Sequence, residues 1–214
     1  MEQSVKIILA SGSPRRKELF ERAGISFSVI KSGAKEVMTK TVPEEAVQEL
    51  AAQKAADVKE RLSESDFLQG LEQDKNKEGI LIVGADTIVV SEGIVLGKPG
   101  NEEEAFRMLM SLSGRTHSVF TGVCGIFLDR EGKVVPERGI SFAEETFVTM
   151  YPFMEEEARA YIRTGEPMDK AGAYGIQGLG GLFVKEIRGD YQNVVGFPLA
   201  AFWRLGCQKN FFRL

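Results

Sequence analysis

The stretch Ala10-Ser11-Gly12-Ser13-Pro14-Arg15-Arg16-Lys17 sets the start of the fold, because it joins a short apolar run to a helical segment. The apolar run, Val5-Lys6-Ile7-Ile8-Leu9, is typical of a buried first strand. Ser13 is a good N-cap, and Pro14 suits the first helical position because its missing N–H has no partner there. Two hydroxyls, three cations and a helix N-terminus favour anion binding, so we predict a phosphate cradle. The alternatives are a solvated basic helix start and a Ser-Pro phosphorylation site.

The composition is that of a soluble globular protein. The 214 residues are 43% hydrophobic and 27% charged, with a net charge of −4. A general nucleic-acid-binding protein would be basic, so we expect no nucleic acid as partner. Residues 1–40 nevertheless hold eight Lys and Arg against four Asp and Glu, which suits a small anionic ligand.

The two cysteines, Cys124 and Cys207, are far apart and give neither a metal-ligand spacing nor a disulfide framework. They indicate a reducing compartment. The first residues lack the pattern of a signal peptide and no run reaches 18 apolar residues, so we expect no signal peptide, no membrane association and a cytoplasmic location. We interpret His117, the single histidine, as structural rather than catalytic.

Apolar periodicity predicts strands and helices in irregular alternation, which indicates an α/β protein with a mixed sheet. Strands are expected over residues 25–30, 80–83, 88–90, 94–96, 117–128, 141–150 and 182–187, and helices over 18–23, 44–62, 102–112, 154–163 and 198–205. Thr41-Val42-Pro43-Glu44 has the pattern of a capping box. The polar segment 63–79 is predicted to be a surface insertion in a single domain over residues 1–214.

Charged groups follow apolar runs at further places, where ligand sites form in α/β sheets. Asp86, at the expected end of the 80–83 strand, suits holding a divalent cation or taking a proton from water; the alternative is a turn aspartate that caps its own backbone. Lys98 either binds phosphate or is an exposed lysine in a turn. Lys54 interrupts the apolar stripe of its helix.

The glycine-dense segment 165–181 does not fit the dinucleotide fingerprint, because Phe183 stands where the third glycine is required. Its polar load, Glu166, Asp169, Lys170 and Gln177, is unusual for a set of tight turns, which is the alternative interpretation. Gln177 can donate and accept hydrogen bonds toward a base edge.

Taken together, these motifs resemble the Maf family of nucleotide pyrophosphatases. The resemblance covers Ile7 to Leu205 and rests on Ser11 to Arg16, Gly84 to Thr87, Gly97 to Pro99, Leu112 to Gly114, Gly165 to Gly178 and Val194 to Leu199. It implies an elongated mixed β-sheet flanked by helices, with two lobes and a central active-site cleft, and a homodimer. It implies hydrolysis of a nucleoside triphosphate to the monophosphate and pyrophosphate with a divalent metal, Mg or Mn.

The resemblance also implies roles for individual residues. Asp86 would accept the proton and, with Glu36, hold the metal. The implied substrate contacts are Ser11, Ser13, Arg16, Lys54, Lys98, Asp169 and Lys170. Arg15, Thr87 and Gln177 match the pyrimidine subfamily, which acts on dTTP and UTP. The sequence leaves open whether modified pyrimidine nucleotides are the substrate, and their removal is a hypothesis about purpose. Two alternatives stay open: a nucleotide-binding regulator of growth or division with little turnover, and a pyrophosphatase for 7-methyl-GTP.

Overall fold

The computed structural model describes residues 2–62 and 76–213. The expected surface insertion at 63–79 therefore lies outside the described residues over 63–75. The strands are β1 Glu2–Gln3, β2 Lys6–Leu9, β3 Phe27–Val29, β4 Gly79–Ser91, β5 Ile94–Leu96, β6 Thr116–Asp129, β7 Ile140–Met150, β8 Val184–Arg188 and β9 Phe212–Arg213. The α-helices are α1 Pro14–Arg22, α2 Pro43–Arg61, α4 Glu102–Leu112, α5 Glu155–Ile162, α6 Tyr191–Val195 and α7 Leu199–Gln208. Short 3-10 helices are η1 Pro136–Arg138, η2 Glu166–Asp169, η3 Ala171–Ala173 and η4 Leu179–Phe183.

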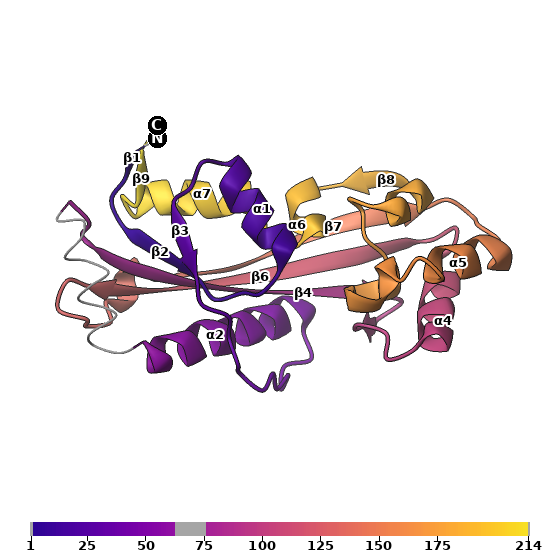
Figure 1. Cartoon of the computed structure of the whole chain (residues 1–214), viewed down its shortest axis with the longest axis horizontal. Helices are drawn as coiled ribbons and strands as arrows, with labels where there is room; N and C mark the ends of the chain where they lie inside the picture. Colours follow the sequence, from indigo (N-terminus) through magenta and orange to yellow (C-terminus); the bar gives the residue numbers. More distant parts are fainter. Residues whose placement is uncertain (1, 63–75, 214) are drawn as a thin grey trace. The chain divides into compact units, whose positions relative to one another are not determined.

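The main sheet is mixed, as the sequence predicts. Its strand order is β3-β2-β4-β6-β7-β8, with β5 paired to β4 (Figure 1). β2 pairs in parallel with β3 and with β4, whereas β5 is antiparallel to β4 and β8 is antiparallel to β7. β1 and β9 form a separate antiparallel pair. Among the described residues, no helix combines the length and the hydropathy that crossing a bilayer requires.

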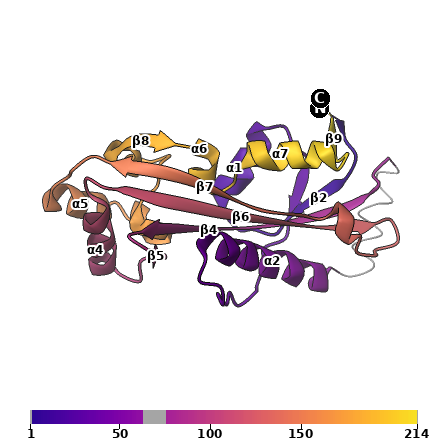
Figure 2. The ribbon, with the colours of Figure 1, turned by 180° about the vertical axis from the view of Figure 1, so that it is seen from behind.

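The chain divides into two compact units. Unit 1 contains residues 1–86, 122–143 and 196–214, and unit 2 contains residues 87–121 and 144–195. In unit 1, α1 and α7 lie on one face of the strands and α2 lies on the other, as both ribbon views show (Figures 1 and 2). Phe20 of α1 packs edge-on against Phe197, and Phe202 of α7 lies next to both rings.

Two glycines allow α2 to approach the sheet of unit 1 closely. A Cβ atom added at Gly84 of β4 would lie 2.2 Å from the carbonyl oxygen of Ala51. One added at Gly122 of β6 would lie 2.3 Å from the carbonyl oxygen of Val47. The helix backbone therefore rests on the strand backbones at two points where no other residue type leaves room.

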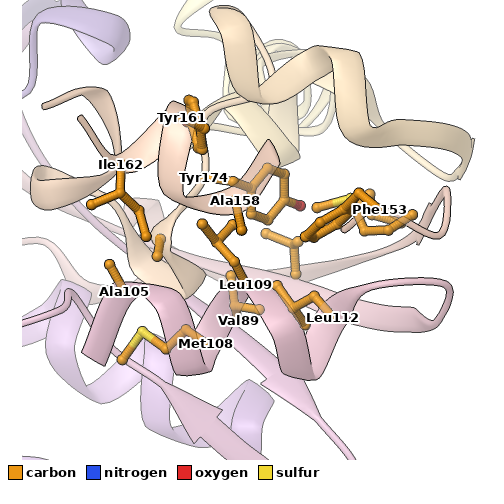
Figure 3. Packing of buried hydrophobic residues seen from close by; sticks show 14 residues of the cluster. Val89, Ala105, Met108, Leu109, Leu112, Phe153, Ala158, Tyr161, Ile162 and Tyr174 are labelled. Atoms are coloured by element: carbon orange, nitrogen blue, oxygen red, sulfur yellow. The ribbon is translucent and has the colours of Figure 1, made fainter. Parts of the chain in front are cut away.

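Unit 2 has its own hydrophobic core, formed by α4, α5, the strands and the 3-10 segments (Figure 3). Leu109 of α4 and Ala158 of α5 face each other near Val89 and Tyr174. His117 is buried in this unit, and its Nε2 lies 2.8 Å from the Tyr174 hydroxyl. Burial lowers the pKa of His117 to about 4, so this histidine is neutral inside the protein at pH 7.

Local signals correctly predict the start of α1. The Ser13 side chain accepts a hydrogen bond from Arg16 N at 3.5 Å, and Pro14 is the first helical residue. The capping box at Thr41 is wrong: the N-cap is Val42, without a side-chain cap, and Pro43 begins α2. Proline fits the first helical position, so the helix starts there and the Thr41 hydroxyl comes one residue too early.

The expectation that the second buried strand ends at Gly84 is also wrong. β4 continues without a break from Gly79 to Ser91, so Asp86 lies within a strand rather than in a turn after one. The glycine that resembles a turn signal is used instead for the close approach of α2. Among the described strands and α-helices, α6, β1 and β9 had no counterpart in the sequence prediction.

Candidate functional site

The opening turn of unit 1 is built around the guanidinium of Arg16. Arg16 is buried; its Nε donates to the carbonyl of Gly196 at 2.8 Å and its Nη1 donates to Ser11 Oγ at 3.3 Å. Ser11 Oγ also accepts from Ser13 N at 3.2 Å. The two serines and the arginine that the sequence singles out are thus brought together where β2 meets α1.

The electrostatics of this turn depend on three further groups, Asp86, Arg15 and Glu36. Burial lowers the pKa of the Arg16 guanidinium from its usual value, and the negative charges of Asp86 and, more weakly, Glu36 act against this shift. The neighbouring Arg15 lowers the same pKa further, which places its charge within electrostatic range of Arg16. An arginine stays protonated in proteins, so a buried positive charge is held at the turn.

A second cluster of unit 1 joins α2, β4 and the loop before α2. Lys54 Nζ donates to Asp86 Oδ1 and lies 3.1 Å from Glu36 Oε1. The side chains of Lys54 and Asp86 are each only 13% exposed, whereas that of Glu36 is 48% exposed. The lysine that interrupts the apolar stripe of α2 is therefore the partner of two carboxylates, which explains its place on that face.

The donor set at this cluster fits a hard divalent cation. Glu36 and Asp86 already converge on one positive charge, the Lys54 ammonium. Carboxylate oxygens are the ligands that Mg²⁺ takes, usually one or two from the protein with the rest from water and phosphate. Within residues 2–62 and 76–213, no group of three or more His, Cys, Asp and Glu could hold a metal. A cation held by these two carboxylates would need further oxygen ligands, of the kind that water and phosphate supply.

In unit 2, backbone hydrogen bonding brings the Lys98 loop to the glycine-rich motif. Gly172 N donates to the carbonyl of Gly97 at 3.1 Å, next to Lys98. Lys170 Nζ donates to Asp169 Oδ1 and to the carbonyl of Glu166, both at 2.6 Å. The Lys98 side chain is exposed. Two cations and one carboxylate predicted for the site thus lie on connected loops.

Glu166 organises the rest of that motif, a role that the sequence did not reveal. Its carboxylate accepts hydrogen bonds from the Tyr161 hydroxyl at 2.9 Å, Leu179 N at 3.0 Å and Gly180 N at 3.2 Å. Burial by itself raises the pKa of Glu166, but these hydrogen bonds outweigh it and the pKa is lowered. The exposed Gln177 lies on the loop that is held in this way.

Glycine at position 178 is required by the same arrangement. A Cβ atom at Gly178 would lie 2.4 Å from Glu166 Oε1. The sequence shows a glycine at position 178 but not the carboxylate that approaches it. The role of Glu166 can therefore be recognised only in the folded loop. Thr87, the remaining predicted residue of unit 2, shares a 2.9 Å hydrogen bond with Thr121, which in turn donates to the carbonyl of Asn193 at 3.1 Å.

Comparisons with known proteins agree with the pattern of residues. The sequence model of the family described as Maf-like protein matches residues 6–207. A dTTP/UTP pyrophosphatase of Thermococcus kodakarensis is 50% identical over 201 residues, which cover 93% of this chain and 94% of that protein. A protein of the same name from Agathobacter rectalis is 47% identical, with coverage of 93% and 95%. A third, from Bacillus thuringiensis subsp. konkukian, is 46% identical, with 91% of each chain covered.

Proposed function

The chain belongs to the Maf-like protein family, and from this premise we propose that it hydrolyses dTTP and UTP to the nucleoside monophosphate and pyrophosphate. Relatives that carry the name dTTP/UTP pyrophosphatase match more than nine tenths of the chain at 46–50% identity. Arg15, Thr87 and Gln177, which by the resemblance distinguish the pyrimidine type, are all present.

Asp86 is the group that we assign to proton transfer. It is the carboxylate nearest to the Lys54 ammonium, and it is mostly shielded from solvent. A water that attacks the α-phosphorus must lose a proton, and a positioned carboxylate that accepts it accelerates such a step by about 10²- to 10⁴-fold. The bond that breaks lies between the α-phosphorus and the bridging oxygen, and the two electrons leave with pyrophosphate.

Positive charge held at fixed positions favours this departure. Arg16 and Lys54 of unit 1 would neutralise phosphate oxygens, because both are kept in place by partners on neighbouring elements. The Ser11 and Ser13 hydroxyls, on the same turn, can donate to those oxygens. In unit 2, Lys98, Lys170 and Asp169 are assigned to the remaining triphosphate contacts.

Glu36 and Asp86 are the residues that we expect to hold a divalent cation, Mg²⁺ or Mn²⁺. Such a cation supplies Lewis acidity toward phosphate oxygens and water, and it offsets the charge of the triphosphate. Gln177 is assigned to the base, because an exposed amide on a fixed loop can both donate to and accept from a pyrimidine edge. The resemblance to the family further supports a homodimer, which light scattering of the purified protein tests.

The observation that carries the proposal is the convergence of Lys54 on Asp86 and Glu36. The test is pyrophosphate release from the common triphosphates, 7-methyl-GTP and modified pyrimidine triphosphates with Mg²⁺ or Mn²⁺. We expect dTTP and UTP to give the highest kcat/KM. Asp86→Asn should lower kcat by about 10²- to 10⁴-fold while dTTP still binds.

Asp129→Asn is the matched control, because the Asp129 side chain, at the end of β6, accepts from Glu131 N and Lys133 N through Oδ1, which an amide oxygen can replace. It should leave turnover unchanged. Nucleotide binding by the wild type without pyrophosphate release would refute the proposal and favour a regulatory protein. Near-normal turnover by Asp86→Asn would remove Asp86 from the reaction.

A further inference from the structure

The loop that carries Glu36 has little apolar packing to hold it. Residues 30–42, between β3 and α2, form neither helix nor strand. Within 31–40 only Ser32 and Ala34 are half-buried, and the other side chains are exposed. A connection of this length inside a compact unit needs another kind of restraint if one of its residues is to stay in place.

The restraint comes from one face of α2. Glu49, Gln53, Asp57 and Arg61 are spaced by four residues, so they form a row along the helix. Each of the four contacts the loop backbone. Glu49 Oε2 accepts from Thr39 N at 2.8 Å, Asp57 Oδ2 accepts from Gly33 N at 2.9 Å, and Arg61 Nη2 donates to the carbonyl of Lys31 at 2.8 Å. The loop therefore runs antiparallel to the helix, with one attachment at each turn.

The hydrogen bonds from the loop change the pKa values of the two carboxylates of this row, Glu49 and Asp57. A hydrogen bond from the Thr39 hydroxyl lowers the pKa of Glu49, and one from Gly33 N lowers the pKa of Asp57. Both groups thus receive hydrogen bonds from the loop in their charged form.

Gln53 makes the most specific attachment. Its Oε1 accepts from Val37 N at 3.0 Å, and its Nε2 donates to the carbonyl of Val37 at 2.6 Å. Both backbone groups of one residue are thereby satisfied by one side chain, as they would be by a neighbouring strand. Only an amide side chain offers a donor and an acceptor in this geometry.

The residue held in this way directly follows Glu36. Gln53 likewise directly precedes Lys54, whose ammonium lies 3.1 Å from Glu36 Oε1. The contact of Gln53 with Val37 and that of Lys54 with Glu36 thus join neighbouring residues on the helix and on the loop, so the amide pair sets which loop residue faces Lys54. A slip by one residue would present Lys35, a cation, or Val37, an apolar side chain, in place of the carboxylate.

We propose that Gln53 is a positioning residue for Glu36: its paired hydrogen bonds to Val37 hold the Glu36 carboxylate beside Lys54 and Asp86. Glu49 and Asp57 support it at the two ends of the loop. The inference rests on the proposed function only for the role of Glu36 as a metal ligand. The attachment of the loop is a separate claim that can be measured without turnover.

Hydrogen exchange of individual amides, followed by NMR, tests the attachment. In Gln53→Ala, the amide of Val37 should exchange about tenfold faster or more, because its acceptor is lost, and that of Thr39 should follow. Gln48→Ala is the matched control. Gln48 is a half-buried glutamine of the same helix, but its partners are Ser141 Oγ and the carbonyl of Glu44. Unchanged exchange at Val37 in Gln53→Ala would overturn the proposal.

The Mn²⁺ dependence of pyrophosphate release from dTTP tests the consequence. Gln53→Ala should raise the half-saturating Mn²⁺ concentration about tenfold and leave kcat at saturating Mn²⁺ within about twofold. Because Gln53 acts through Glu36, the double variant Glu36→Gln/Gln53→Ala should be no worse than Glu36→Gln alone. Fully additive effects, or an unchanged Mn²⁺ dependence, would refute this role. If the wild type released no pyrophosphate, the proposed function would fall, and hydrogen exchange alone would decide whether Gln53 holds the loop.

Discussion

Gly84→Ala tests how closely α2 must lie on β4. The new Cβ atom would be 2.2 Å from the carbonyl oxygen of Ala51 and 2.9 Å from the nitrogen of Ala55. An ordinary contact needs 3.4 Å, so the helix must move away from the strand by about 1.2 Å. Neither obstacle is a flexible side-chain end; both are helix backbone, so a local rotamer change cannot absorb the clash.

The displacement falls on the proposed reaction centre. Lys54 is three residues beyond Ala51 on α2, and Asp86 is two residues beyond Gly84 on β4. Misplacement of a reacting group by about 1 Å can cost about 10²-fold in rate, so we expect kcat to fall by that order. Overpacking of this kind costs about 1–3 kcal/mol of stability, which for a chain of this size lowers Tm by about 2–12 °C.

The assay is pyrophosphate release from dTTP at saturating Mg²⁺, together with a thermal melt. Ala56→Gly is the control, because it destabilises the same helix by about 1 kcal/mol without adding an atom. It should lower Tm and leave kcat unchanged. If Gly84→Ala kept the wild-type kcat and Tm, the close approach of α2 to β4 would not be needed. If only Tm fell, the Lys54–Asp86 ion pair would tolerate the displacement of the helix.

Three further predictions concern unit 2. Because the pKa of His117 falls from 6.5 to about 4 on folding, the unfolded chain takes up this proton first, and stability is lost as pH falls from about 6.5 to about 4. Between pH 7 and pH 4.5, Tm should therefore fall more in the wild type than in His117→Phe; parallel Tm profiles would contradict this. Glu166→Gln replaces an acceptor of the 175–180 loop by a donor, so the ratio of kcat/KM for dTTP to that for GTP should fall severalfold with little change in Tm. An unaltered ratio would make Glu166 purely structural. Gln177→Glu should reorder the preference among nucleotides measured by kcat/KM, and an identical ranking would remove Gln177 from base recognition.

Features that depend on adjacent residues could be predicted from the sequence. The Ser13 cap, Pro14 at the first helical position and the hairpin of β4 and β5 each use signals within a few residues. Glu92 and Gly93 of that hairpin have positive φ angles of 51° and 79°, which a tight two-residue turn requires.

Features that depend on partners far away in the sequence could not be predicted. The sequence marks Lys54 as a misfit on an apolar stripe, but the periodicity of α2 does not indicate its contact with Asp86, 32 residues away. The resemblance implied only that the two residues belong to one site. The sequence did not indicate a role for Gln53, because a single glutamine on a helix is common. Its role depends on the loop that it binds in the folded structure. For the same reason the turn-like Gly84 was misinterpreted, since the helix that needs the space lies in another segment of the chain.

The division into units has a consequence for the order in which the protein can form. Unit 1 needs residues 196–214, since Phe197 and Phe202 close its aromatic core around Phe20. Both segments of unit 2 leave the ribosome before that stretch does. The half that begins the chain is therefore the last to acquire all its residues during synthesis, and Arg16 cannot meet the carbonyl of Gly196 until then.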